Sequence, residues 1–302
     1  MASQGEEAVN GKPDISNLGF TPMVKVSGQW EVDKALEKIH GDVPKSGSQS
    51  PLSFFHMLER LKTTKREGWR RFGIDRYVFR SSCSHDSSVL WREEMKLCLP
   101  MLLHRRARYR GESISDHMYR MSIISMFAPP SLAARLDLNK CMKMCLIHDM
   151  AELLVGDITP VDGVAKPEKS RRESLTMDFL TKNLFGNKDD AAVGKEIRDI
   201  WDEYEESKTL DSHYVHDVDK MELLLQMMEY ERRAQGTLDL QEFTHVRKRM
   251  TLPETKAWAD ELIREREAFW ADERNGDVDG EGDAKEGVDE KKRMQDEYYA
   301  RS

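Results

Sequence analysis

The sequence lacks the features that mark several common classes of protein. No run of about 18 apolar residues occurs in the chain, and Met1 is not followed by a signal-peptide pattern, so we expect no membrane insertion. Positive charge is not in excess: a net charge of -8 argues against nucleic acid or an anionic membrane surface as the main partner. Neither GxGxxG nor GxxxxGK followed by Ser or Thr occurs, which excludes the common phosphate-binding loops.

Cysteine is scarce and irregularly spaced. The chain has four, at positions 83, 98, 141 and 145, and no CxxC pair, which argues against a metal or disulfide role. Cys141 and Cys145 lie one helical turn apart among apolar residues, and we interpret them as reduced core residues. The expected location is therefore the cytoplasm, with the nucleus as the alternative.

Apolar residues recur at helical spacing through most of the chain, and no run alternates as a strand would. The pattern predicts an all-α fold with at least six helices. Composition divides the chain into three parts. Residues 1–50 form a mostly disordered arm with a helical island at Trp30–His40, residues 51–272 form a helical domain, and residues 273–302 form an acidic disordered tail.

The most informative segment is Leu138–Pro160. It is apolar almost all the way round, which predicts a helix buried in a core. His148, Asp149 and Glu152 fall within one arc of about 100° on that helix. Because an unpaired charge is costly to bury, this arc requires a partner or a metal ion.

Two distant segments offer such partners. His117 lies in the first turn of a helix that Ser113–Asp116 can cap, and Asp219 projects from an apolar stripe between Val215 and Leu223. A single histidine on an apolar face is more often a hydrogen-bonded core residue than a ligand. Taken with His148 and Asp149, however, the set has two imidazoles and two carboxylates, which suits a divalent first-row transition ion.

Four motifs in order carry a family resemblance: GESISDHMYRM at 111–121, HDMAELLVGDITP at 148–160, EKSRRE at 168–173 and VDKMELLLQ at 218–226. The sequence resembles the HD-domain 5′-deoxynucleotidase family, in its eukaryotic HD domain-containing protein 2 branch. The resemblance covers residues 53–234, apart from the segment after Trp69. It implies an HD-domain helical bundle and a homodimeric phosphohydrolase. Its substrates would be deoxyribonucleoside 5′-monophosphates, and its cofactor a divalent metal such as cobalt or manganese.

The resemblance also assigns the metal site and the catalytic residues. Glu152 matches the family's catalytic acid/base, and Asp149 takes part both in catalysis and in metal binding. The matched metal ligands are the four residues that the helical spacing selects: His117, His148, Asp149 and Asp219.

The implied substrate contacts are Trp69, Asp157, Ile158 and Thr159. Pattern alone indicates that Trp69 covers the core, whereas the resemblance makes it the residue that covers the nucleotide. Glu152 and Asp157, with the carbonyl of Ile158, could also hold a second and harder ion such as magnesium.

Two departures from the family stand out. Bacterial relatives have a phosphate-orienting arginine before the tryptophan, where this chain has Gly68, so Arg70 or Arg172 would have to serve. Residues 72–110 form an atypical insertion without periodicity, where relatives have a short loop. We hypothesise that this insertion is a translated intron or gene-model artefact. It contains a second pair, His85-Asp86, whose serine-rich flanks indicate a solvated loop.

Other functions remain open from sequence. One is an HD phosphohydrolase acting on cyclic, tri- or bis-phosphorylated nucleotides. Another is a di-iron oxygenase, which needs further histidines; only His213 and His216 lie between the HD pair and Asp219. The third is a non-catalytic HD scaffold disabled by the insertion, which the complete ligand set with Glu152 disfavours.

Overall fold

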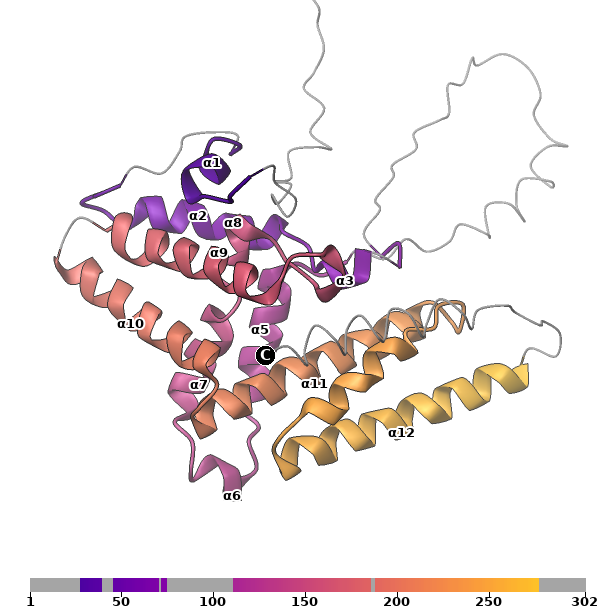
Figure 1. The fold of residues 1–302 in the computed structure, drawn as a ribbon. Coiled ribbons are helices and arrows are strands. Elements are labelled where there is room, and N and C mark those ends of the chain that lie inside the picture. The colour runs from indigo at the N-terminus through magenta and orange to yellow at the C-terminus, as the bar shows by residue number, and fades with distance from the viewer. Residues whose placement is uncertain (1–27, 40–45, 71, 75–110, 186–187, 277–302) are drawn as a thin grey trace, which may run out of the picture.

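A computed structural model describes residues 28–39, 46–70, 72–74, 111–185 and 188–276 (Figure 1). Over these ranges the regular elements are all helices, and the β-pairing consists of two isolated bridges, Ser48 with Phe185 and Lys65 with Ser113. The prediction of an all-α fold is confirmed. The C-terminal tail from residue 277, most of the N-terminal arm and residues 75–110, including His85-Asp86, lie outside the described residues.

The elements follow one another in this order: α1 (Val32–Leu36), α2 (Leu52–Thr63), α3 (Glu67–Arg70), α5 (Ile114–Ser125), α6 (Pro130–Ala133), α7 (Leu138–Ile147), α8 (Glu152–Val155), a 3-10 turn (Pro160–Asp162), α9 (Lys166–Asp178), a π-helical turn (Phe179–Asn183), α10 (Lys188–Glu206), α11 (Leu210–Arg233), a 3-10 helix (Gln241–Arg249) and α12 (Pro253–Gly276).

The centre of the fold is the packing of α5 against α7 and α11. Met121, Met144 and Val218, one from each of these helices, are fully buried. Burying each such side chain contributes about 1.5–3 kcal/mol relative to leaving it exposed. In Figure 1, α2, α8 and α9 lie together above α5, and α12 lies along α11. No helix among the described residues is long and apolar enough to span a bilayer.

Helix α5 begins where the sequence predicts. The Ser113 hydroxyl accepts a hydrogen bond from the Asp116 amide at 3.1 Å, and the Asp116 carboxylate accepts one from the Ser113 amide at 2.8 Å. This capping box satisfies amides that the first helical turn would otherwise leave without partners. It fixes the start of α5 one turn before His117.

The sequence predicts one buried helix that ends at Gly156, but the structure divides it into two. Helix α7 ends at Ile147 and α8 begins at Glu152. Between them the backbone tightens to i to i−3 hydrogen bonds, from the Glu152 amide to the Asp149 carbonyl and from Leu153 to Met150. This break places His148 and Asp149 in a turn, and Gly156, at φ 82°, ends α8.

The helical island predicted at Trp30–His40 forms α1 and packs on α8 and α9. Trp30 is fully buried, and its carbonyl accepts a hydrogen bond from Arg171 at 2.8 Å. This segment is therefore part of the packed domain, ahead of the boundary predicted at residue 51.

Candidate metal centre

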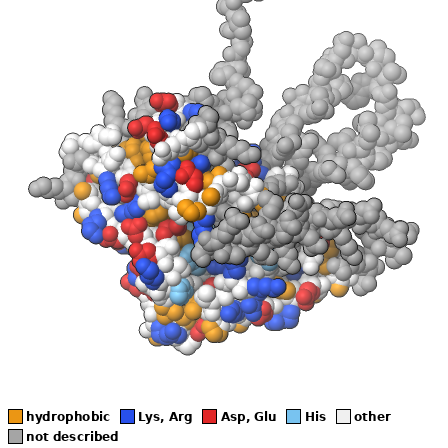
Figure 2. All heavy atoms as spheres, viewed as in Figure 1, with side chains coloured by type: hydrophobic (Ala, Val, Ile, Leu, Met, Phe, Trp, Pro, Cys, Tyr) orange, Lys and Arg blue, Asp and Glu red, His pale blue; other side chains and the backbone are white. Residues whose placement is uncertain are grey.

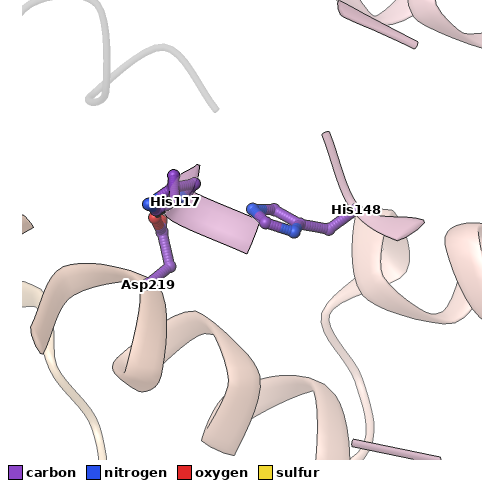
Figure 3. A group of neighbouring side chains, drawn as sticks. All are labelled: His117, His148 and Asp219. Carbon is purple, nitrogen blue, oxygen red and sulfur yellow. Dashed lines mark ion pairs between the residues drawn. The ribbon is translucent and has the colours of Figure 1, made fainter. Parts of the chain in front are cut away.

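Three helices bring the predicted metal ligands together. His117 in α5, His148 at the end of α7 and Asp219 in α11 each place one ligand atom within 4.8 Å of the others (Figure 3). His117 Nε2 lies 3.2 Å from Asp219 Oδ1. Asp149 joins them, because its Oδ2 lies 3.2 Å from His148 Nε2 and 3.7 Å from His117 Nε2. The four side chains thus converge on one point from three elements.

The other ring nitrogens are turned outward to acceptors. His117 Nδ1 lies 2.6 Å from Glu222 Oε2, and His148 Nδ1 lies 2.9 Å from the Cys145 carbonyl. A carbonyl oxygen and an ionised carboxylate only accept hydrogen bonds, so each Nδ1 carries a hydrogen. In the neutral form of such a ring, the lone pair of Nε2 points to the centre.

The centre contains buried polar atoms without partners. Within the described part of the chain, neither imidazole Nε2 has a hydrogen bond of good geometry, and Glu152 Oε2 also lacks one. Buried polar atoms are normally paired, because each unpaired one costs about 1–3 kcal/mol. A divalent ion would give both nitrogens a partner, and the nitrogen and oxygen donor set suits a transition metal. The residues therefore fit a metal.

A neighbouring group, Glu112, His117 and Glu222, also has the composition of a metal site. Its carboxylates already have donors, however. Trp69 Nε1 donates to Glu112 at 2.6 Å, and Arg120 Nε donates to Glu222 at 2.8 Å. We therefore interpret this second group as a hydrogen-bonded network that supports the first.

Electrostatics keep the two aspartates ionised. Burial would raise the pKa of Asp149 and of Asp219, but the neighbouring histidines and Arg66 outweigh it and hold both pKa values well below the usual range. For His117, burial and Arg66 lower the pKa, but Glu222 and Asp219 raise it by a larger amount. The net effect is a pKa raised to about 10. In the metal-free protein His117 is thus protonated at neutral pH, and a metal ion must displace that proton.

Glu152 lies in the first turn of α8, next to the His148–Ala151 turn, and is 2% exposed. Burial, with the charges of Asp149 and Asp157, raises its pKa well above the usual value, although the Lys169 ammonium 4.0 Å away acts in the opposite direction. A carboxyl group with a raised pKa can donate a proton at neutral pH. This behaviour suits an acid/base residue.

Sequence reasoning missed the cation that faces the centre. Arg66, between α2 and α3, has Nη1 at 3.2 Å from Asp149 Oδ2 and Nη2 at 4.0 Å from Asp219 Oδ1. The two arginines suggested from sequence pair instead with Glu67 and Glu168 respectively. The available signal is the arginine three residues before the tryptophan.

Trp69 is buried rather than open to the centre. The residue is 2% exposed, and its ring packs against Phe243 and Tyr230, with ring centroids 4.6 and 5.3 Å away. Its indole nitrogen donates to Glu112. This placement matches the role that pattern alone indicated for Trp69, a residue that covers the core.

The predicted substrate loop follows α8. Asp157 Oδ2 accepts a hydrogen bond from the Glu67 amide at 2.7 Å, which ties the loop to the start of α3. Ile158 is buried, and the Thr159 hydroxyl donates to Asp162. The structure thus brings Asp157 near Glu152, but Lys169 lies 4.0 Å from the same Glu152 carboxylate that a second ion would use.

The two further histidines do not face the centre. His213 Nε2 lies 2.8 Å from the Ser207 carbonyl, and His216 Nε2 lies 3.0 Å from the Tyr204 carbonyl. The His216 ring stacks on Tyr204, which in turn packs against His148. The arrangement disfavours a di-iron centre, because neither residue extends the ligand set.

The chain is similar to several known proteins. The HD domain family model matches residues 103–258. The 5′-deoxynucleotidase hdd1 of Schizosaccharomyces pombe is 36% identical over 75% of this chain and 96% of its own length. The 5′-deoxynucleotidase HDDC2 of Xenopus laevis is 40% identical over 66% of this chain and 78% of its own. A solved structure of the HD domain-containing protein YGK1 is 33% identical, covers 59% of this chain and 86% of its own, and gives a TM-score of 0.44.

The chain belongs to the HD domain family. HD domains are metal-dependent, and the four convergent side chains provide a candidate metal site.

Proposed function

We propose that this protein is a metal-dependent 5′-deoxynucleotidase that hydrolyses deoxyribonucleoside 5′-monophosphates to deoxynucleoside and phosphate. The observation that carries the proposal is the convergence of His117, His148, Asp149 and Asp219, with the acid Glu152 in the adjoining helix. The names of hdd1 and HDDC2, both 5′-deoxynucleotidases, support the substrate class.

The four convergent side chains would hold the ion. When bound, a divalent ion polarises a phosphate oxygen and lowers the pKa of a water molecule. In hydrolysis the water oxygen bonds to phosphorus, the bond from phosphorus to O5′ breaks, and O5′ gains a proton. Glu152 is buried beside the ligands and has a raised pKa, so it would relay that proton from water to the leaving oxygen.

Arg66 would position the substrate phosphate. Its guanidinium contacts Asp149 and is only 14% exposed, so it presents a fixed charge at the centre. Guanidinium groups bind phosphate oxygens through paired hydrogen bonds. We therefore propose that Arg66 replaces the arginine that bacterial relatives have at the position of Gly68.

For the main site we propose cobalt or manganese, since two imidazoles and two carboxylates suit these ions. A second site for magnesium would use Glu152, Asp157 and the Ile158 carbonyl. An ion there would compete with the Lys169 ammonium, which already lies near Glu152. We therefore expect the second ion to bind more weakly than the first.

We also propose a homodimer formed through the outer face of α5. Tyr119 and Ile123 on α5, with Met126 and Phe127 directly after its last residue, are 38–70% exposed. Such an exposed apolar patch is typical of a subunit contact. Phe127→Glu should shift the protein from dimer to monomer in light scattering, and an unchanged dimer mass would contradict this interface.

For location we propose the cytoplasm, where the buried thiols of Cys141 and Cys145 would stay reduced.

We propose that the part of the predicted insertion after Ile74, residues 75–110, is dispensable for the fold. The segments that flank them are already joined: the Ile114 amide donates to the Thr64 carbonyl at 3.0 Å, and Lys65 Nζ donates to the Gly111 carbonyl at 2.8 Å. A short loop between them would suffice. Sequencing the spliced transcript tests the intron hypothesis, and a mature message that encodes these residues would rule it out.

Phosphate release from a panel of nucleotides tests the function. Deoxyribonucleoside 5′-monophosphates should be hydrolysed with cobalt or manganese, whereas cyclic nucleotides and triphosphates should not. Hydrolysis restricted to the latter compounds would favour another HD phosphohydrolase. A folded, metal-loaded protein that hydrolyses none of them would favour the non-catalytic scaffold.

A further inference from the structure

A chain of ion pairs leads from His117 to the outside of the metal centre. Glu222 Oε2 lies 2.6 Å from His117 Nδ1, and Arg120 Nε donates to Glu222 Oε1 at 2.8 Å. Arg120 also donates to Gln226 at 2.8 Å and to Glu229 at 3.0 Å. One face of α11 thus holds Arg120 at three points, and Arg120 in turn holds Glu222.

The Glu222 side chain is fully buried between His117 and Arg120. Each carboxylate oxygen faces one of these two partners, so neither can turn away without leaving a buried charge unpaired. Breaking a buried ion pair in this way is strongly destabilising.

The two histidines of the centre differ in this respect. The Nδ1 of His148 faces the backbone carbonyl of Cys145, which is neutral. Substituting the Cys145 side chain would leave this carbonyl in place. The Nδ1 of His117 faces a charged side chain. The tautomer and ring orientation of His117 are therefore set by a residue that can be replaced.

We propose that Glu222 is a positioning residue of the metal centre and that Arg120 fixes Glu222 in turn. The inference rests on the proposed metal site but not on the identity of the substrate. Glu222 holds the hydrogen on His117 Nδ1 and so directs Nε2 toward the ion. It does so from behind the ring and is itself no ligand.

Arg120 lies at the partly exposed edge of this network. Its side chain is 27% exposed and borders a cavity of about 560 Å³ between α5 and α11, which Glu112, Gln226 and Tyr230 also line. Arg120→Met therefore offers a second test in case Glu222→Gln does not fold. Glu229→Gln is the matched control, because it removes a carboxylate two turns farther along the same face of α11, where it pairs with Arg120 and Arg233.

The test measures the dissociation constant of Co²⁺ by calorimetry on the full chain, with helicity and the melting temperature as fold controls. Glu222→Gln should weaken binding about 10- to 100-fold. Glu222→Asp should recover part of the loss, Arg120→Met should weaken binding by a smaller factor, and Glu229→Gln should leave it near the wild-type value.

A folded Glu222→Gln protein that binds Co²⁺ with wild-type affinity would overturn the proposal. If only Arg120→Met folds, wild-type Co²⁺ affinity in that variant would overturn it. Wild-type protein that binds no Co²⁺ would overturn the metal centre and this inference together. Wild-type protein that binds Co²⁺ without releasing phosphate from nucleotides would contradict the proposed function alone.

Discussion

Arg66 and Asp149 form an ion pair inside the metal centre, with 3.2 Å between Nη1 and Oδ2. A guanidinium beside a metal ligand competes with the ion for the same carboxylate and repels it electrostatically. Such an arrangement is useful only if a third, anionic group arrives to share the guanidinium. The phosphate of a nucleotide is such a group.

Arg66→Ala should lower kcat/KM for deoxynucleotides by about 10- to 100-fold, since charge-assisted hydrogen bonds contribute about 1.5–3 kcal/mol. Metal affinity should stay the same or increase, because Asp149 loses a competitor. Steady-state kinetics and calorimetry measure the two effects. Arg70→Ala, which removes an arginine paired with Glu67 near the surface, is the control and should keep wild-type kinetics. Equal losses in both variants would contradict a specific role for Arg66.

Metal binding should release protons at neutral pH. The pKa of His117 is raised to about 10 in the metal-free protein, and a metal needs the neutral imidazole. The apparent affinity should therefore increase as the pH rises toward 10. Calorimetry of Co²⁺ binding at pH 7, in buffers of different ionisation enthalpy, should give about one proton released per ion. Heats that do not depend on the buffer would contradict the protonated state of His117.

Glu152→Gln should separate catalysis from stability. General acid/base groups contribute about 10²- to 10⁴-fold to the rate, so kcat should fall by that order while the main metal site still binds. The folded pKa of Glu152 is raised, so protonation stabilises the fold at low pH, and this contribution is lost as the pH rises above the unfolded value. Glutamine cannot ionise, so the metal-free variant should melt at the wild-type temperature or higher at pH 8. A variant with wild-type kcat and a much lower melting temperature would contradict both the catalytic role of Glu152 and the predicted effect on stability.

Asp217 and Asp219 should behave in opposite ways. The fully buried Asp217 accepts hydrogen bonds from the amides of Thr251 and Leu252 and from the Thr255 hydroxyl, and so fixes the start of α12. Asp217→Ala should cost about 2–3 kcal/mol of unfolding free energy and leave metal binding by the folded fraction intact. Asp219→Ala should abolish metal binding with a smaller loss of stability. Denaturant unfolding and calorimetry distinguish the two variants, and a reversed pattern would contradict the assignment.

The sequence predicted those parts of the centre that depend on helical periodicity. His117 and Asp219 were found because each is a polar residue on an apolar stripe, and the all-α fold follows from the same spacing. The break between α7 and α8 was missed, because it depends on local hydrogen bonds that a uniformly apolar segment does not signal.

Tertiary contacts explain the other differences. Arg66 belongs to a basic run that resembles a solvated helix end, and only the folding of the α2–α3 connection turns it toward Asp149. Glu222 lies in the motif used for the resemblance, but its contact with His117 joins residues 105 positions apart. Trp30 begins the helical island predicted within the arm, but its full burial and its hydrogen bond to Arg171 of α9 depend on contacts that the local sequence does not signal.

The most direct test of the account is phosphate release from deoxyribonucleoside 5′-monophosphates by metal-stripped protein before and after adding cobalt or manganese. Wild-type protein should regain activity with metal, and Asp149→Ala should not. Asp86→Ala, which alters the second His-Asp pair of the sequence, should respond like wild type. Activity in metal-stripped wild-type protein, or activity of Asp149→Ala equal to wild type after metal is added, would contradict the central claim.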